Sequence, residues 1–168
     1  PEDRVKLRHT VNTTGRPYEL VAESKLTNRA DRPLRHALAV HTDAWRAKHE
    51  VEGGMFRVSP LLTHVECVTK DGTTTRLTPG EFEPDDFQNA EHFPRNPVNL
   101  GDWYQAPGAP ALAAVSNAYF SHAVVPLHGP APACQLQIEA RWDHRAHKNE
   151  SADPNSGAMY RARLAYPP

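Results

Sequence analysis

The sequence predicts an all-β protein, an antiparallel β-sandwich with little helix. Apolar and polar residues alternate in the runs 5–12, 18–27 and 134–143, which is the period expected of strands with one buried face. The 16 prolines cannot lie inside long helices or central strands, so they indicate frequent loops and sheet edges. Because the sequence shows no amphipathic helix of useful length, these observations favour a sandwich.

The composition fits one folded domain. Of 168 residues, 39% are hydrophobic and 23% are charged, so the chain can bury a core. A net charge of −1 provides no field that attracts DNA or RNA, and we expect no nucleic-acid partner. We expect residues 1–168 to form a single β-sandwich domain. Since the chain begins Pro1-Glu2 without a signal peptide, we interpret it as a fragment of something larger.

The first half of the chain contains three alternating runs and one clear hairpin signal. The runs 5–12, 18–27 and 34–40 predict an antiparallel meander in which each strand buries one face. Residues 70–72 read Lys-Asp-Gly between two β-prone runs, and Asp-Gly in that position predicts a tight turn. Residues 79–97 are acidic and rich in proline, so we expect a long surface loop there.

The second half is equally rich in strand signals. Residues 112–115 and 119–125 are strand-like, and either a turn beginning at Ser116 or a short helix capped by Ser116 can connect them. Residues 134–143 alternate most cleanly, and residues 160–166 alternate again after a polar loop.

Histidine and acidic side chains raise the hypothesis of a metal site. Ligand types gather at Asp143, His144, His147 and Glu150. The i, i+3 spacing of those two histidines converges on a helix, whereas here they follow a predicted strand. His64 and Glu66 share one face of a strand, but without a third ligand. We therefore predict no metal site and no cofactor.

Signatures of catalysis are missing from the sequence. No serine lies in a Gly-x-Ser-x-Gly motif, and nothing in the sequence around Cys67 indicates an activated thiol. The carboxylates at 81–86 lack the apolar surroundings that raise a pKa in a glycosidase pair. We predict that the chain is not an enzyme and has no catalytic residue.

The large aromatic side chains admit two interpretations. Trp45, Trp103, Tyr104 and Trp142 could line a groove for a sugar or a peptide. We favour core packing, since aromatic residues supply much of the buried area of a core. A solvent-facing groove in which Trp103, Tyr104 and Trp142 meet two carboxylates or a histidine would instead support a carbohydrate-binding or carbohydrate-processing domain.

One stretch of the sequence resembles a known family. Residues 112–126 read Leu-Ala-Ala-Val-Ser-Asn-Ala-Tyr-Phe-Ser-His-Ala-Val-Val-Pro. They resemble the W-x-A-v-x-n-x-Y-F-x-x-A-x-x-P stretch in the large periplasmic domain of YidC-type membrane protein insertases. The matching motif residues are Tyr119, Phe120, Pro126 and Trp103, which we carry over as structural residues only. In this chain an insertion, residues 105–111, separates the tryptophan from the strand that follows it.

The resemblance extends in order to residues 18–33 and 160–167, which are similar to two further strands of that domain. It implies a β-supersandwich of the galactose-mutarotase type, as a fragment of a periplasmic domain. It also implies a membrane-anchored full-length protein, with this part at the periplasmic face of a bacterial inner membrane. The implied function is non-catalytic assistance in membrane protein insertion and folding. The implied partners are the insertase transmembrane core in the same chain, Sec translocon components and exported membrane proteins.

The two cysteines, Cys67 and Cys134, lack the spacing of a zinc ribbon. A disulfide and a pair of small unpaired hydrophobic residues are both compatible with the sequence. The compartment implied by the resemblance is oxidising, and this leads to the hypothesis that the two pair. A Cα separation above ~7 Å would exclude the bond.

Overall fold

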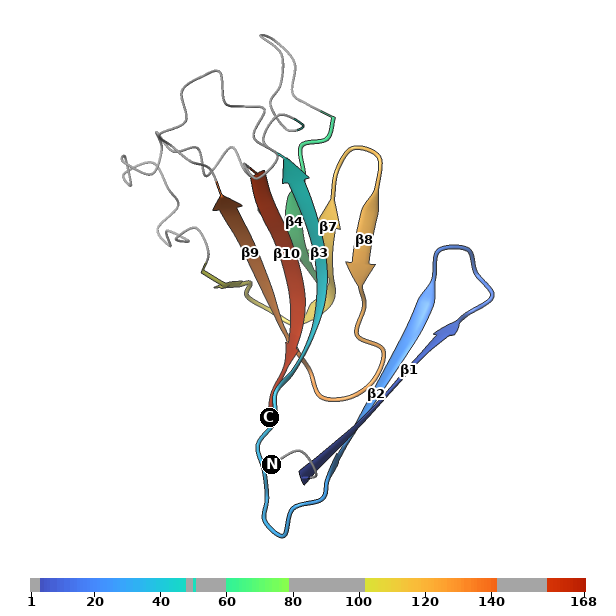
Figure 1. Ribbon diagram of the computed structural model, residues 1–168. Helices are drawn as coiled ribbons and strands as arrows, with labels where there is room; N and C mark the ends of the chain where they lie inside the picture. The colour runs from blue at the N-terminus through green and yellow to red at the C-terminus, as the bar shows by residue number, and fades with distance from the viewer. Residues whose placement is uncertain (1–3, 48–49, 51–59, 79–101, 142–156) are drawn as a thin grey trace. The chain divides into compact units, whose positions relative to one another are not determined.

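The computed structural model describes residues 4–47, 50, 60–78, 102–141 and 157–168. The chain forms two compact units, residues 1–36 and residues 37–168. We expected one sandwich over the whole chain. The first unit holds a β-hairpin, and the sandwich is built within the second unit (Figure 1).

The first unit contains the antiparallel strands β1 (Val5–Thr13) and β2 (Leu20–Asn28). Gly15, at φ 81°, lies in the connection between them, and a backbone in this left-handed region favours glycine. The predicted meander is wrong in its third strand, because β3 (Leu38–Ala47) pairs with the last strand of the chain and not with β2. The predicted burial of one face in each strand is also wrong for the hairpin, in which Leu7, Val11, Leu20 and Leu26 are exposed.

The second unit contains two four-stranded antiparallel sheets packed face to face, which confirms the all-β sandwich. One sheet has the order β3-β10-β9-β6, where β6, β9 and β10 are Tyr104–Gln105, Ala133–Arg141 and Gly157–Tyr166. The other has the order β5-β4-β7-β8, formed by Thr74–Leu77, His64–Thr69, Pro110–Ser116 and Ser121–Val124.

Local sequence explains these elements. In β10 the buried residues Ala158, Tyr160, Ala162 and Leu164 alternate with half-buried ones, so a period of two places one face in the core. The predicted turn at 70–72 joins β4 to β5, and its glycine has φ 87°. The connection after β7 is a turn, which decides between the turn and the helix that the sequence left open.

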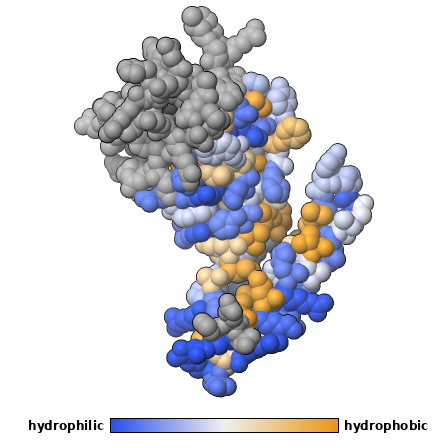
Figure 2. Space-filling view, in the orientation of Figure 1, coloured by the Kyte–Doolittle hydropathy of each residue, from blue (hydrophilic) through white to orange (hydrophobic). Residues whose placement is uncertain are grey.

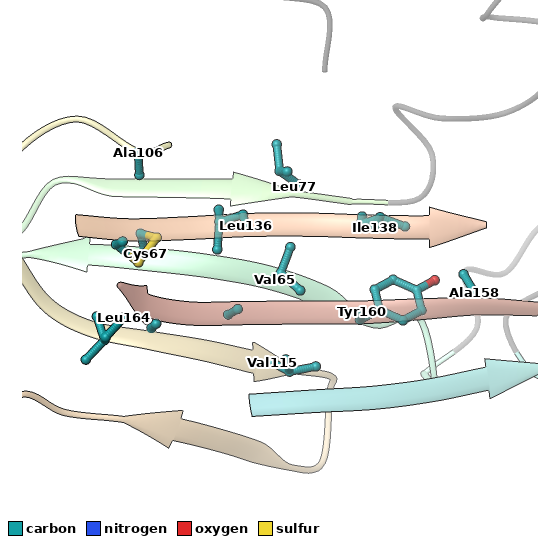
Figure 3. Close-up of a cluster of buried hydrophobic side chains, with 13 residues drawn as sticks. Val65, Cys67, Leu77, Ala106, Val115, Leu136, Ile138, Ala158, Tyr160 and Leu164 are labelled. Atoms are coloured by element: carbon teal, nitrogen blue, oxygen red, sulfur yellow. A yellow bond between two sulfur atoms is a disulfide. The ribbon is translucent and has the colours of Figure 1, made fainter. Parts of the chain in front are cut away.

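A disulfide joins the two sheets within the buried core (Figure 3). Cys67 lies in β4 of one sheet and Cys134 in β9 of the other, and their Cα atoms are 6.1 Å apart. This separation is below the ~7 Å that would have excluded the bond. Val65, Leu136 and Leu164 belong to the same buried cluster as the two cysteines. Since the bond closes a loop with a sequence separation of 67, the chain-entropy model assigns it about 4 kcal/mol of stability.

A hydrogen-bonded contact links the sheets a second time, between β3 and β8. The Thr42 hydroxyl, which is buried, lies 2.8 Å from Nδ1 of His122 and 3.2 Å from the carbonyl oxygen of the same residue. The hydroxyl has a single proton, which it donates to the carbonyl. It then accepts a hydrogen bond from Nδ1–H, which selects that tautomer of His122.

Tyr160 provides a test of the core. Its ring is fully buried, and its hydroxyl has no hydrogen-bond partner within the described part of the chain. Burial raises the pKa of Tyr160 well above its usual value, and the nearby charge of Arg46 opposes this rise. An unpaired buried hydroxyl costs free energy. We therefore expect Tyr160→Phe to leave the free energy of unfolding unchanged or to raise it by about 1 kcal/mol.

Chemical denaturation of Tyr160→Phe and Tyr160→Ala measures this effect. The alanine variant removes the ring as well and should lose about 3–5 kcal/mol. A loss of more than about 1 kcal/mol in the phenylalanine variant would show that the hydroxyl makes a stabilising hydrogen bond.

Candidate functional site

The candidate site is the turn between β7 and β8, residues 117–120, together with the polar network beneath it. We call residues 117–120 the aromatic turn. It contains Tyr119 and Phe120, two residues of the motif, and it is held by the Asn117 side chain and by backbone hydrogen bonds.

Asn117 fixes the shape of the aromatic turn. Its side-chain oxygen accepts hydrogen bonds from the backbone N–H groups of Tyr119 and Phe120, at 2.8 and 2.9 Å. The Asn117 N–H donates to the carbonyl oxygen of Phe120 at 2.8 Å, and the Ala118 N–H donates to the carbonyl oxygen of Pro60 at 3.3 Å. Asparagine commonly nucleates turns in this way, and here it leaves the two aromatic residues little backbone freedom.

Both aromatic side chains point into solvent. Tyr119 is 65% exposed and Phe120 is 77% exposed. Pro126 follows the end of β8 and is half-buried. The aromatic pair is therefore at the surface, whereas residues 113–116 of the same stretch are buried.

The polar network beneath the turn centres on Glu66 of β4. Its carboxylate accepts two hydrogen bonds from Arg76 of β5, at 3.2 and 2.9 Å, and one from the hydroxyl of Ser116 at 3.3 Å. Ser116 is also 2.8 Å from the hydroxyl of Ser121, so the two serines tie the ends of β7 and β8 together. His64 Nε2 lies 3.6 Å from the same carboxylate. The Glu66 carboxylate thus joins β4, β5 and β7, and the contact between the two serines adds β8 to the network.

The environment of His64 alters its proton affinity. Burial lowers the pKa of His64 below its usual value, the charge of Arg76 lowers it further, and Glu66 acts in the opposite direction. The neutral ring is therefore favoured in the folded chain. The side chain of Glu66 is only 15% exposed, so its pairing with Arg76 offsets the cost of burying a carboxylate.

This arrangement ties the ends of the strands together next to the aromatic turn. The Ser116 hydroxyl donates to Glu66, and His64 also faces Glu66. Among the described residues, no group of three or more His, Cys, Asp or Glu side chains could hold a metal ion.

Two of the three aromatic residues proposed for a sugar groove, Trp103 and Tyr104, are not part of this site. The sequence favoured core packing for Trp103, but its side chain lies outside the core cluster. Its ring contacts the Arg163 guanidinium, 3.7 Å from the ring centroid, and His41 lies edge-on at 5.6 Å. Tyr104 packs against the core. Trp142 lies outside the described residues. The sugar groove that the sequence suggested is therefore not formed by Trp103 and Tyr104, which have different environments.

The sequence identified part of this site and missed the rest. The sequence places His64 and Glu66 on one face of a strand. The other members of the network, Arg76, Ser116 and Ser121, come from other strands. The spacing of the two serines around a four-residue turn was the available signal, because it predicts that they lie opposite each other. The remaining metal-ligand and acidic candidates, at 143–150 and 81–86, lie outside the described residues.

Comparisons with known proteins do not assign the chain to a group. Neither the family models, nor the curated proteins, nor the solved structures contain a match to it. Within the described part of the chain, no helix has the length and apolar character needed to cross a membrane.

His64 should make the stability of the protein depend on pH. Folding lowers the pKa of His64. The contribution of the neutral ring to the free energy of unfolding is therefore fully present above the pKa of the unfolded chain, near 6.5. It is lost as the pH falls through the lower folded value. Chemical denaturation at a series of pH values should show a steeper loss of stability on acidification for the parent chain than for His64→Gln.

A matched control is His128→Gln, which removes an exposed histidine. This control should keep the pH dependence of the parent. If the free energy of unfolding of the parent and of His64→Gln fell equally with decreasing pH, the folded protein would not favour the neutral form of His64.

Proposed function

We propose that this chain is a non-catalytic periplasmic domain of a YidC-type membrane protein insertase and that the aromatic turn is its contact surface. The observation that carries the proposal is the exposure of Tyr119 and Phe120 on a turn fixed by hydrogen bonds. A motif that served only packing would be buried, whereas exposed aromatic residues are typical of binding surfaces.

Physical reasons support a contact role for the turn. Aromatic side chains are enriched among the residues that dominate binding energy. Ordering flexible groups costs free energy on association, so a turn already held by Asn117 and by the Ser116–Ser121 contact loses less entropy when it binds. We propose three partners. They are Sec translocon components, exported membrane proteins, and the insertase transmembrane core in the same chain.

The disulfide supports the compartment in this proposal. Bonds such as Cys67–Cys134 form and persist in oxidising environments, among them the bacterial periplasm, and are rare in reducing ones. A position at the periplasmic face of the inner membrane agrees with this chemistry.

A carbohydrate-binding domain is the alternative that the sequence raised, and the geometry favours it less. Sugar binding commonly needs an open aromatic face. The guanidinium of Arg163 covers a face of Trp103 and is held there by a 2.7 Å hydrogen bond from its Nε to the Gln135 side chain. Tyr104 packs against the core and offers no second platform beside it.

Site-specific photo-crosslinking in membranes tests the proposal. The full-length protein would carry p-benzoylphenylalanine in place of Phe120. We expect adducts with a translocon subunit or with a membrane protein that is being inserted, because Phe120 is the more exposed of the two aromatic residues. The matched control places the same probe at Lys70, which is exposed in the turn between β4 and β5.

Adducts at Phe120 and not at Lys70 would support the proposal. The same adducts at both positions, or none at either, would contradict a contact surface at the turn. A full-length protein without transmembrane segments would contradict the insertase assignment itself.

A further inference from the structure

Basic side chains are concentrated in the first unit of the chain. Residues 1–36 contain eight Lys and Arg and five Asp and Glu, a net charge of +3, in a chain whose total is −1. This leaves a net charge of −4 for residues 37–168. The hairpin unit is therefore the part of the molecule that attracts anions.

One face of the β1–β2 hairpin is apolar. The strand register places Leu7 opposite Leu26 and Val11 opposite Ala22 on this face, and Leu20 lies on it at the end of β2. The four larger residues of the set are 41–67% exposed, and hydrophobic side chains are visible among hydrophilic ones in Figure 2. A two-stranded hairpin is at best marginally stable in water. A cluster of exposed apolar residues on such an element marks a surface that binds something.

The opposite face carries the cations Arg8 and Lys25 and also the carboxylate of Glu23. Arg8 of β1 is directly opposite Lys25 of β2 in the register. Both side chains are exposed, and neither has an ion-pair partner among the residues that the structure describes. Like charges placed directly opposite each other destabilise a hairpin, so a nearby anionic surface would relieve a cost that the hairpin bears alone.

We infer that the β1–β2 hairpin binds the surface of an anionic lipid bilayer. Its apolar face, with Leu7 and Leu26 at the centre, enters the boundary between headgroups and acyl chains. Arg8 and Lys25 are on the other face, and their long side chains reach past the edge of the hairpin to the headgroups. An apolar face combined with basic side chains is the combination that holds amphipathic elements at such interfaces. The positive charge favours lipid over a second copy of the hairpin, which would carry the same charge. The inference does not rest on the insertase proposal.

Vesicle co-sedimentation with the purified, oxidised full chain tests it. The probes are vesicles of phosphatidylcholine alone and of phosphatidylcholine with equimolar phosphatidylglycerol. Binding should be detectable with the anionic vesicles, weak with the neutral ones, and reduced by added salt. Leu7→Asp should weaken binding at least about tenfold, and the double variant Arg8→Gln, Lys25→Gln roughly tenfold or more.

Leu127→Asp is a matched control, because Leu127 is 60% exposed, Leu7 is 59% exposed, and both variants change the charge equally. This control lies outside the hairpin unit and should bind like the parent. Near-ultraviolet circular dichroism checks that each variant keeps a folded sandwich. Equal binding to neutral and anionic vesicles, or equal losses for Leu7→Asp and Leu127→Asp, would overturn the inference. Self-association of the parent without lipid, abolished by Leu7→Asp, would assign the apolar face to a second copy instead.

Discussion

The covalent bond between Cys67 and Cys134 is the constraint on which the sandwich depends. It joins β4 of one sheet to β9 of the other inside the shared core (Figure 3). In β4, Cys67 points inward and its neighbour Glu66 points outward, because successive side chains in a strand alternate. Fixing β4 therefore also fixes the carboxylate that ties Arg76 and Ser116 to it. The aromatic turn is positioned through this chain of contacts, from core to surface.

Local patterns in the sequence predicted most of the strands. The period of two predicts β1, β2, β9 and β10, and Asp71-Gly72 predicts the turn between β4 and β5. Partner choice was not predictable in the same way. The pairing of β3 with β10 joins residues from 38–47 to residues from 157–166, and a strand pattern says which face is apolar without saying which strand lies beside it.

The site was less predictable than the fold, for three physical reasons. Trp103 is apolar over most of its surface, yet its ring also attracts a guanidinium, so Arg163 stabilises it on the outer face of a sheet. The network at Glu66 requires side chains from four strands to meet, and that follows only from register. The exposure of Phe120 had no sequence signal of its own, because hydrophobic residues are found on surfaces as well as in cores.

The two surfaces proposed for contact differ physically. The aromatic turn presents a small pair of rings on a backbone held by hydrogen bonds, whereas the hairpin presents a wider apolar face with positive charge behind it. Rigid aromatic anchors suit a shaped protein partner, and a flat amphipathic element suits a fluid surface that adapts to it. The sandwich is the scaffold of the aromatic turn, so the disulfide that holds the sandwich together also keeps this turn in place.

Chemical denaturation of the parent chain and of the double variant Cys67→Ala, Cys134→Ala tests that claim most directly. If the bond holds the two sheets together, the variant should unfold with a free energy about 4 kcal/mol lower than that of the parent. Adding a reductant to the parent should lower its stability by a similar amount and leave the variant unchanged. Equal stability of the two proteins under oxidising conditions would contradict the account.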